Sequence, residues 1–364
     1  MLGSKFPIAS PVSDLAASRR TVKILILKPS SLGDVIHALP VLRLIKLHHP
    51  DASVHWWIEK NLSPLLEGDR DLDGILHFRR KRWTSPWRWD ELTRSILDIR
   101  RHRFDWVIDL QSLLRSGAMA WLANGGRTMG LDDPREGARG FYDIIVPRRT
   151  VETHAVDWYL DVLPPMGVPV RREFEWLPER SAVARAVEAK WPREGARWIA
   201  LQPGARWWNK RWPVEHFAAL VREISGAHPD VRFAIMGGSD DRALGSALAQ
   251  ACPERCLDLT GRTSLPEMIE WLRRCSLLIT NDTGPMHIAA ALGTPVLGLF
   301  GPTNPRRTGP YGPGHRTMQA ALPCVPCMKE SCGNINTLEC LRAITPQAVA
   351  ANAVSMLVGP SRAG

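Results

Sequence analysis

Short, continuous apolar runs alternate with longer segments of mixed character along most of the chain. The runs at residues 24–27 (ILIL) and 277–280 (LLIT) are typical of strands buried on both faces of a parallel sheet. The pattern predicts strands at residues 22–28, 53–59, 104–110, 142–147, 198–202, 231–236, 256–259, 277–280 and 295–300. Helix-length segments lie between them, among them residues 34–47, 89–101, 213–225 and 285–292. This alternation predicts an α/β fold with parallel sheets.

A boundary interrupts the pattern near the middle of the chain. Residues 164–169 (PPMGVP) disfavour helices and strands, a charged stretch follows at 171–179, and strand–helix alternation then restarts. A length of 364 residues also favours two domains. We therefore predict two doubly wound domains that face each other across a cleft. Their expected bounds are 21–170 and 181–364, with a leader at 1–20 and a linker at 171–180.

The hydropathy of the chain bears on its localisation. Residues 1–20 lack the continuous apolar core of a signal peptide, so we interpret them as a flexible leader. No stretch approaches the roughly 18 uncharged apolar residues that a membrane-spanning helix needs. These features predict a cytoplasmic protein.

Charge is unevenly distributed. Lys and Arg number 47 against 37 Asp and Glu, which gives a net charge of +10. Residues 79–103 hold nine basic and three acidic residues, so this segment contributes +6. Two interpretations stay open. The basic patch fits a polyanionic partner, such as nucleic acid, anionic lipid head groups or a phosphorylated substrate, and it also fits a solvated arginine-rich surface.

The first candidate site follows the first predicted strand, at residues 28–34 (KPSSLGD). Ligands of doubly wound sheets bind outside the carboxyl ends of the strands, where this loop is expected. Gly33 allows close backbone approach. Asp34 has two possible roles, because an acid in the first helical turn can cap the helix or can act as a general base in the cleft.

The second candidate site is residues 281–287 (NDTGPMH), directly after the strand predicted at 277–280. Thr283 or Gly284 can cap the next helix, and Pro285 suits its first turn. The positive end of that helix would favour a pyrophosphate. His287 lies one turn further on, where it has either a structural role or a role in this site.

Two more loops follow predicted strands. In residues 202–213, Lys210 could neutralise a phosphate leaving group, or the loop could simply be basic with core tryptophans. In residues 237–241, a carboxylate could bind ribose hydroxyls or cap a helix. The chain lacks the P-loop pattern and has no GxGxxG after the first strand, which disfavours a dinucleotide oxidoreductase. We interpret Asp71-Leu72-Asp73 as a surface turn rather than a metal-binding motif.

Four of the seven cysteines cluster late in the chain. Cys324, Cys327, Cys332 and Cys340 lie within 17 residues, and four thiolates can hold a structural zinc ion. Their spacing departs from that of common zinc ribbons. Reduced thiols that pack a Cys-rich loop at 324–340 are the favoured interpretation, and no metal site is assigned.

Three segments together resemble the family 9 glycosyltransferases, the ADP-heptose:lipopolysaccharide heptosyltransferases. They are residues 28–42 (KPSSLGDVIHALPVL), 203–217 (PGARWWNKRWPVEHF) and 281–305 (NDTGPMHIAAALGTPVLGLFGPTNP), in the order and spacing of the family. The resemblance covers roughly residues 22–349. Residues 103–117 (RFDWVIDLQSLLRSG) and 134–143 (PREGARGFYD) are most similar to the heptosyltransferase I branch, which adds the first heptose to Kdo-lipid A.

The resemblance implies a GT-B fold of two Rossmann-like domains, with the acceptor on the N-terminal domain and the nucleotide sugar on the C-terminal one. It implies inverting transfer with no cofactor and no catalytic metal. Asp34 matches the catalytic base and Lys210 the lysine at the donor phosphates. The donor-binding residues would be Ser31, Gly33, Lys210, Asp282, Thr283, Gly284, His287 and, as a looser match, Asp240. The acceptor-binding residues would be Arg79, Arg80, Lys81, Arg82 and Arg135.

The implied partners are ADP-heptose, Kdo-lipid A and the anionic inner face of the inner membrane, where the protein would be peripheral, with no nucleic acid. A family 9 enzyme with another donor or acceptor, such as the second heptose, is the main alternative. A non-catalytic nucleotide binder or a nucleic-acid binder belongs to a different class. The presence of Asp34 argues against a sensor, because a sensor needs phosphate contacts but no base.

Overall fold

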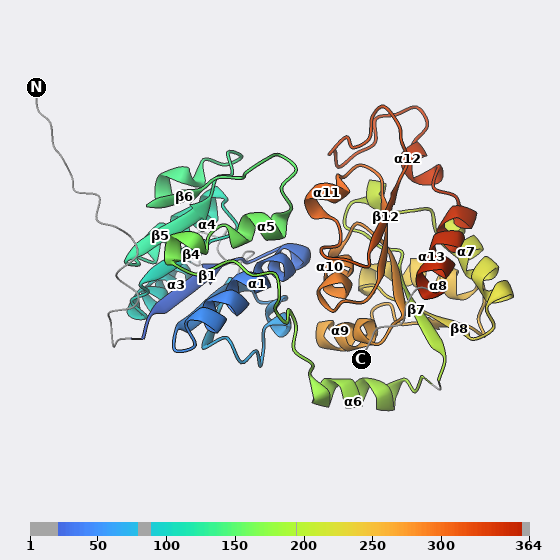
Figure 1. Cartoon of the computed structure of the whole chain (residues 1–364), viewed down its shortest axis with the longest axis horizontal. Helices are drawn as coiled ribbons and strands as arrows, with labels where there is room; N and C mark the ends of the chain where they lie inside the picture. Colours follow the sequence, from blue (N-terminus) through green and yellow to red (C-terminus); the bar gives the residue numbers. More distant parts are fainter. Residues whose placement is uncertain (1–20, 79–88, 194, 359–364) are drawn as a thin grey trace, which may run out of the picture. The chain divides into compact units, whose positions relative to one another are not determined.

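The computed structural model describes residues 21–78, 89–193 and 195–358. The predicted leader and the basic residues Arg79, Arg80, Lys81 and Arg82 lie outside this part of the chain. The chain divides into two compact units between Trp176 and Leu177. Each unit is built on a six-stranded parallel sheet (Figure 1). None of the described helices is long and apolar enough to cross a membrane.

The sheet of the first unit has the strand order β3-β2-β1-β4-β5-β6. Its strands are β1 (Lys23–Leu27), β2 (Ser53–Glu59), β3 (Gly74–Phe78), β4 (Trp106–Asp109), β5 (Arg127–Leu131) and β6 (Ile144–Val146). Its α-helices are α1 (Leu32–His48), α3 (Trp89–Arg101), α4 (Leu114–Leu122) and α5 (Ala155–Leu160). Buried side chains of β1, including Leu25 and Leu27, pack with Ile99 of α3 and Met119 of α4. Helix α1 packs against α5.

The sheet of the second unit has the order β12-β11-β10-β7-β8-β9. Its strands are β7 (Arg197–Gln202), β8 (Val231–Ile235), β9 (Cys256–Asp258), β10 (Leu277–Asn281), β11 (Val296–Phe300) and β12 (Arg316–Gln319). Its α-helices are α6 (Ser181–Lys190), α7 (Val214–Ala227), α8 (Arg242–Ala249), α9 (Leu265–Arg273), α10 (Gly284–Ala291), α11 (Pro305–Thr308), α12 (Glu339–Arg342) and α13 (Pro346–Val358). Figure 1 shows α9 and α10 on one side of this sheet and α7, α8 and α13 on the other.

The apolar runs located the central strands, and the α/β prediction with parallel sheets is confirmed. Three strands were not predicted: β3 (GILHF), β5 (RTMGL) and β12 (RTMQ). β3 and β12 lie at sheet edges, where polar side chains are tolerated and no continuous apolar run is needed. In β5, Gly130 is required because the ring of Tyr142 lies where a Cβ atom would be. Residues 71–73 form a turn before β3, as predicted.

A buried ion pair fastens this turn to α1. The guanidinium of Arg43 donates to both carboxylate oxygens of Asp69, at 2.6 and 2.7 Å, and to Asp71 at 2.7 Å. The side chains of Arg43 and Asp69 are 9% and 4% exposed. Since such a pair is largely desolvated, removal of one partner leaves a buried charge without compensation.

We expect Arg43→Met to destabilise the chain by about 3–5 kcal/mol, because Asp69 then stays buried and charged. Urea unfolding followed by tryptophan fluorescence measures this as an earlier transition. The matched control is Arg94→Met, which removes the exposed Arg94–Asp90 pair on α3 and should change stability by less than about 1 kcal/mol. Equal midpoints for the two variants would contradict the importance of the buried pair.

Candidate functional site

Each sheet has a topological switch point. There, two central strands lie side by side, and the connections that follow them run toward opposite edges of the sheet. The switch point lies between β1 and β4 in the first unit and between β7 and β10 in the second. Ligands of doubly wound sheets bind outside the carboxyl ends of strands at such points. Asp34 follows β1, Lys210 follows β7 and Asp282 follows β10. These three predicted residues therefore lie at the switch points of their own sheets, whereas Asp240 follows β8.

The N-terminus of α1 holds Asp34 by a capping box. The backbone amide and the hydroxyl of Ser31 both donate to Asp34 Oδ2, at 3.0 and 2.8 Å. Asp34 is half-buried, and Gly33 beside it is buried. The capping role considered for Asp34 is thus present. It fixes the carboxylate at the start of α1, and this position is compatible with a second role as a base.

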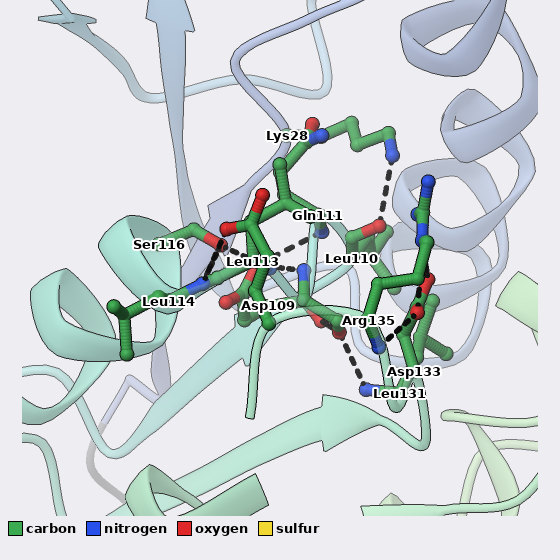
Figure 2. Close-up of polar contacts among 12 residues, drawn as sticks. Lys28, Asp109, Leu110, Gln111, Leu113, Leu114, Ser116, Leu131, Asp133 and Arg135 are labelled. Carbon is green, nitrogen blue, oxygen red and sulfur yellow. Dashed lines mark hydrogen bonds and ion pairs between the residues drawn. The ribbon is translucent and has the colours of Figure 1, made fainter. Parts of the chain in front are cut away.

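A buried polar network lies between the ends of β1 and β4 (Figure 2). Lys28 Nζ donates to the Leu110 carbonyl at 2.9 Å. Asp109, fully buried, accepts from the Tyr142 hydroxyl at 2.7 Å and from the Ser112 amide at 3.0 Å. Burial lowers the pKa of Lys28 and raises the pKa of Asp109, because each charged form loses its hydration.

Arg135 lies in the same electrostatic neighbourhood as Asp34. Its guanidinium donates to Asp133 through Nε at 2.9 Å and Nη2 at 2.6 Å (Figure 2). Burial raises the pKa of Asp133, but the hydrogen bonds from Arg135 outweigh this and hold it below its usual value. The charge of Asp34 acts on the pKa values of Arg135, Lys28 and Tyr159. The Arg135 side chain is 70% exposed, so its cation is available to a ligand.

In the second unit, Lys210 and Asp282 form an ion pair across the switch point. Lys210 Nζ lies 2.6 Å from Asp282 Oδ2, and the Thr303 hydroxyl donates to the same oxygen at 2.7 Å. Lys210 Nζ also lies over the ring of Trp207, 4.4 Å from its centroid. Asp282 is 7% exposed and Lys210 18%, so the pair is mostly shielded from solvent. The carboxylate and the ring together hold the ammonium group in place.

Asn281 fixes the loop that carries Lys210. Its side-chain oxygen accepts from the Trp212 amide at 2.9 Å, and its Nδ2 donates to the Pro203 carbonyl at 2.7 Å. Asn281 is completely buried, so both contacts are shielded from water. They join the two ends of the loop between β7 and α7 to the end of β10. No role was predicted for Asn281, although its place directly before Asp282 was a usable signal.

The remaining predicted donor residues have less defined roles. Thr283 is the N-cap of α10, and Gly284 begins the helix. His287 lies on α10 and is 8% exposed. Asp240 is exposed, whereas the neighbouring Asp241 accepts from the Gly238 amide at 3.1 Å and packs where a Cβ atom at Gly204 would lie. The carboxylate that organises this loop is therefore that of Asp241. No signal in the sequence distinguished it from Asp240 or gave Thr303 a role.

All seven cysteines lie among the described residues, and each is a free thiol there. Cys324, Cys327, Cys332 and Cys340 line one pocket of about 170 Å³. Burial, and then the other three thiols, raise the pKa of Cys340. Within residues 21–78, 89–193 and 195–358, no three His, Cys, Asp or Glu side chains are already gathered as a metal centre.

A comparison with known protein families decides the relationship. The profile of glycosyltransferase family 9 (heptosyltransferase) matches residues 92–337. The chain belongs to this family. It is therefore a glycosyltransferase, and its two doubly wound sheets are those of a GT-B enzyme. The matched range begins after Asp34, so it does not include the first candidate site.

Two relatives and two solved structures illustrate the similarity. The chain is 29% identical to lipopolysaccharide heptosyltransferase 1 of Pseudomonas aeruginosa, over 93% of this chain and 99% of that protein. It is 27% identical to lipooligosaccharide heptosyltransferase 2 of Haemophilus influenzae, over 79% of this chain and 86% of that protein. The structure of E. coli ADP-heptose LPS heptosyltransferase II has a TM-score of 0.75 at 21% identity. The similarity covers 92% of this chain and 98% of that one. The structure of E. coli heptosyltransferase WaaC with ADP has a TM-score of 0.72 at 23% sequence identity. The similarity covers 92% of this chain and 100% of that one.

Proposed function

We propose that this family 9 enzyme transfers a heptose from ADP-heptose to Kdo-lipid A of the lipopolysaccharide inner core. The transfer inverts the anomeric configuration and uses no metal ion in the reaction. The observation that carries the proposal is the Lys210–Asp282 pair at the switch point of the second sheet, beside the start of α10. The similarity to a lipopolysaccharide heptosyltransferase 1 along nearly its whole length supports the choice of sugar and acceptor.

The donor diphosphate would bind at the second unit. Lys210 and the positive end of the α10 dipole would neutralise the pyrophosphate as its negative charge grows. Asp282 is an acceptor-only carboxylate, so it does not bind phosphate itself; it would orient the Lys210 ammonium group through their 2.6 Å contact. Thr303 would hold Asp282 in turn, at 2.7 Å. Thr283, Gly284 and His287 would complete the donor site on α10.

The acceptor would bind at the first unit. Asp34 would take the proton from the acceptor hydroxyl while the oxygen attacks the anomeric carbon, and ADP would leave from the opposite face. Arg135 would contact an acidic group of the acceptor, because its exposed guanidinium lies in the electrostatic neighbourhood of Asp34. By their charge, Arg79, Arg80, Lys81 and Arg82 would attract the anionic acceptor and the anionic membrane, with the protein peripheral on its cytoplasmic side.

The described part of the basic segment supports an exposed cationic face. Ile99 of α3 is buried, whereas Arg94, Arg100 and Arg101 are exposed. This arrangement suits contact with an anionic surface, and no nucleic acid is needed to explain the charge.

The decisive experiment measures ADP release from ADP-heptose with and without Kdo-lipid A. We expect release only when the acceptor is present, because the base acts on an acceptor hydroxyl. Heptosylated Kdo-lipid A, detected by mass spectrometry, would identify the product. Binding of ADP-heptose without release on this acceptor would keep the donor assignment but contradict the acceptor; in that case Kdo-lipid A that already carries one heptose is the next substrate. Absence of donor binding would contradict the donor assignment itself.

A further inference from the structure

The Cys-rich loop of the second unit plays no part in the proposed reaction. It joins β12 to α12, and the described residues 320–338 contain no helix or strand. Three of the clustered cysteines lie in this loop, and Cys340 lies on α12. All four are half-buried and line the same pocket. Thiols that are separated by up to 16 positions in the sequence therefore border one pocket in the fold.

Two polar side chains accompany the thiols. Asn334 Nδ2 donates to Cys324 Sγ at 3.2 Å, a contact that stabilises negative charge on sulfur. Asn209 lines the same pocket and is 2% exposed, and its Oδ1 atom has no hydrogen-bond partner among the described residues. A buried polar atom without a partner is costly, so this oxygen requires a hydrogen-bond donor in the pocket, such as water.

We propose that Cys324, Cys327, Cys332 and Cys340 bind one divalent metal ion that prefers thiolate ligands, with Zn²⁺ as the first candidate. The ion would be structural and would take no part in heptose transfer. Four thiols would each release a proton and donate a lone pair, which gives a four-coordinate thiolate centre with no change in oxidation state. Cys324 and Cys327 would supply one pair of ligands, and Cys332 and Cys340 the other.

The thiols are not yet gathered at ligand distances, so metal binding must draw them together across the pocket. The four thiols border one pocket of about 170 Å³, so each can approach a shared ion by movement into that space. Few backbone hydrogen bonds oppose it, since the loop belongs to no sheet or helix. Most of its residues are half-buried or exposed, so a metal cross-link would provide stability that a hydrophobic core does not.

The loop also contacts the residue before Lys210 and the residue before Thr303, whose hydroxyl donates to Asp282. Asn209 Nδ2 donates to the Lys329 carbonyl at 2.9 Å, and Asn209 directly precedes Lys210. The Met328 amide donates to the Pro302 carbonyl at 2.7 Å, and Pro302 directly precedes Thr303. A metal-ordered loop would therefore hold the two segments that position Asp282 and Lys210.

The test is metal content and cobalt binding of the full chain, purified under reducing conditions. We expect about one metal ion per chain by elemental analysis, and added Co²⁺ should give the absorption bands of tetrahedral cobalt thiolate. Cys327→Ser should weaken binding at least tenfold. Cys252→Ser is the matched control, because Cys252 is also a half-buried free thiol but lies outside the cluster, and it should bind metal like the unmodified chain.

Three outcomes would overturn the proposal: no metal above trace and no cobalt spectrum, equal binding by Cys327→Ser and the unmodified chain, or a disulfide within the cluster in freshly reduced protein. Each measurement is made without substrate, so it is independent of the proposed transferase reaction. Removal of the metal by a chelator should also lower the Tm of the unmodified chain but leave that of Cys327→Ser unchanged.

Discussion

Asp34→Asn should lower kcat for heptose transfer by about 10²–10⁴-fold, the usual contribution of a general base. The asparagine oxygen can still accept from the amide and hydroxyl of Ser31, so the capping interactions and α1 should persist. An amide cannot take the proton of the acceptor hydroxyl, and this is the function that the substitution removes. ADP affinity and Tm should therefore change little. Steady-state ADP release with saturating acceptor measures the loss.

Asp90→Asn is the matched control for Asp34→Asn. Asp90 is also an acid in the first turn of a helix of the first unit, α3, where it forms an exposed pair with Arg94. Its substitution should leave transfer nearly unchanged. If Asp34→Asn retained full activity, Asp34 would be a capping residue only. If it lost activity together with Tm, the effect would come from α1 rather than from the proton.

The sequence predicted which loops follow the central strands, but it did not predict the contacts between those loops. Asp34, Lys210 and Asp282 were predicted because each follows a strand, and a parallel sheet brings the carboxyl ends of its strands to one edge. The pairing of Lys210 with Asp282 was not predictable, since the two residues are 72 positions apart and meet only because β7 and β10 are neighbours. The same holds for Thr303, which reaches Asp282 because β11 lies beside β10.

Local sequence patterns were ambiguous for acidic residues, because a carboxylate at the start of a helix can cap the helix or bind and react with a ligand. An acid three residues after Ser31 predicts a capping box, and the structure contains it, but the pattern alone cannot exclude catalysis. Between Asp240 and Asp241, the sequence offered two adjacent acids in one loop. Only the fold shows that Asp241 packs against Gly204 while Asp240 faces solvent. Composition likewise could not predict strands such as β12, whose residues are mostly polar.

Lys210→Ala should lower kcat by about 10²–10³-fold, comparable to the loss of one preorganised donor at a developing charge. The cation is held by Asp282 and by the Trp207 ring before substrate binds, so little reorganisation is needed during the reaction. Its removal also leaves Asp282, 7% exposed, without its ionic partner. That carboxylate would repel the donor pyrophosphate, so ADP affinity should fall as well. The control Lys190→Ala removes an exposed lysine that pairs with Glu267 at 3.4 Å, and it should leave turnover unchanged.

A double-mutant cycle separates the two consequences of Lys210→Ala. Addition of Asp282→Asn removes the repulsive charge and keeps an acceptor for the Thr303 hydroxyl, so the double variant should bind ADP more tightly than Lys210→Ala alone. Its kcat should stay low, because the cation at the leaving group is still absent. Additive effects on ADP affinity would mean that the two side chains do not act as a unit. Normal turnover of Lys210→Ala, with only a lower Tm, would make the pair a structural feature of the loop and remove Lys210 from the reaction.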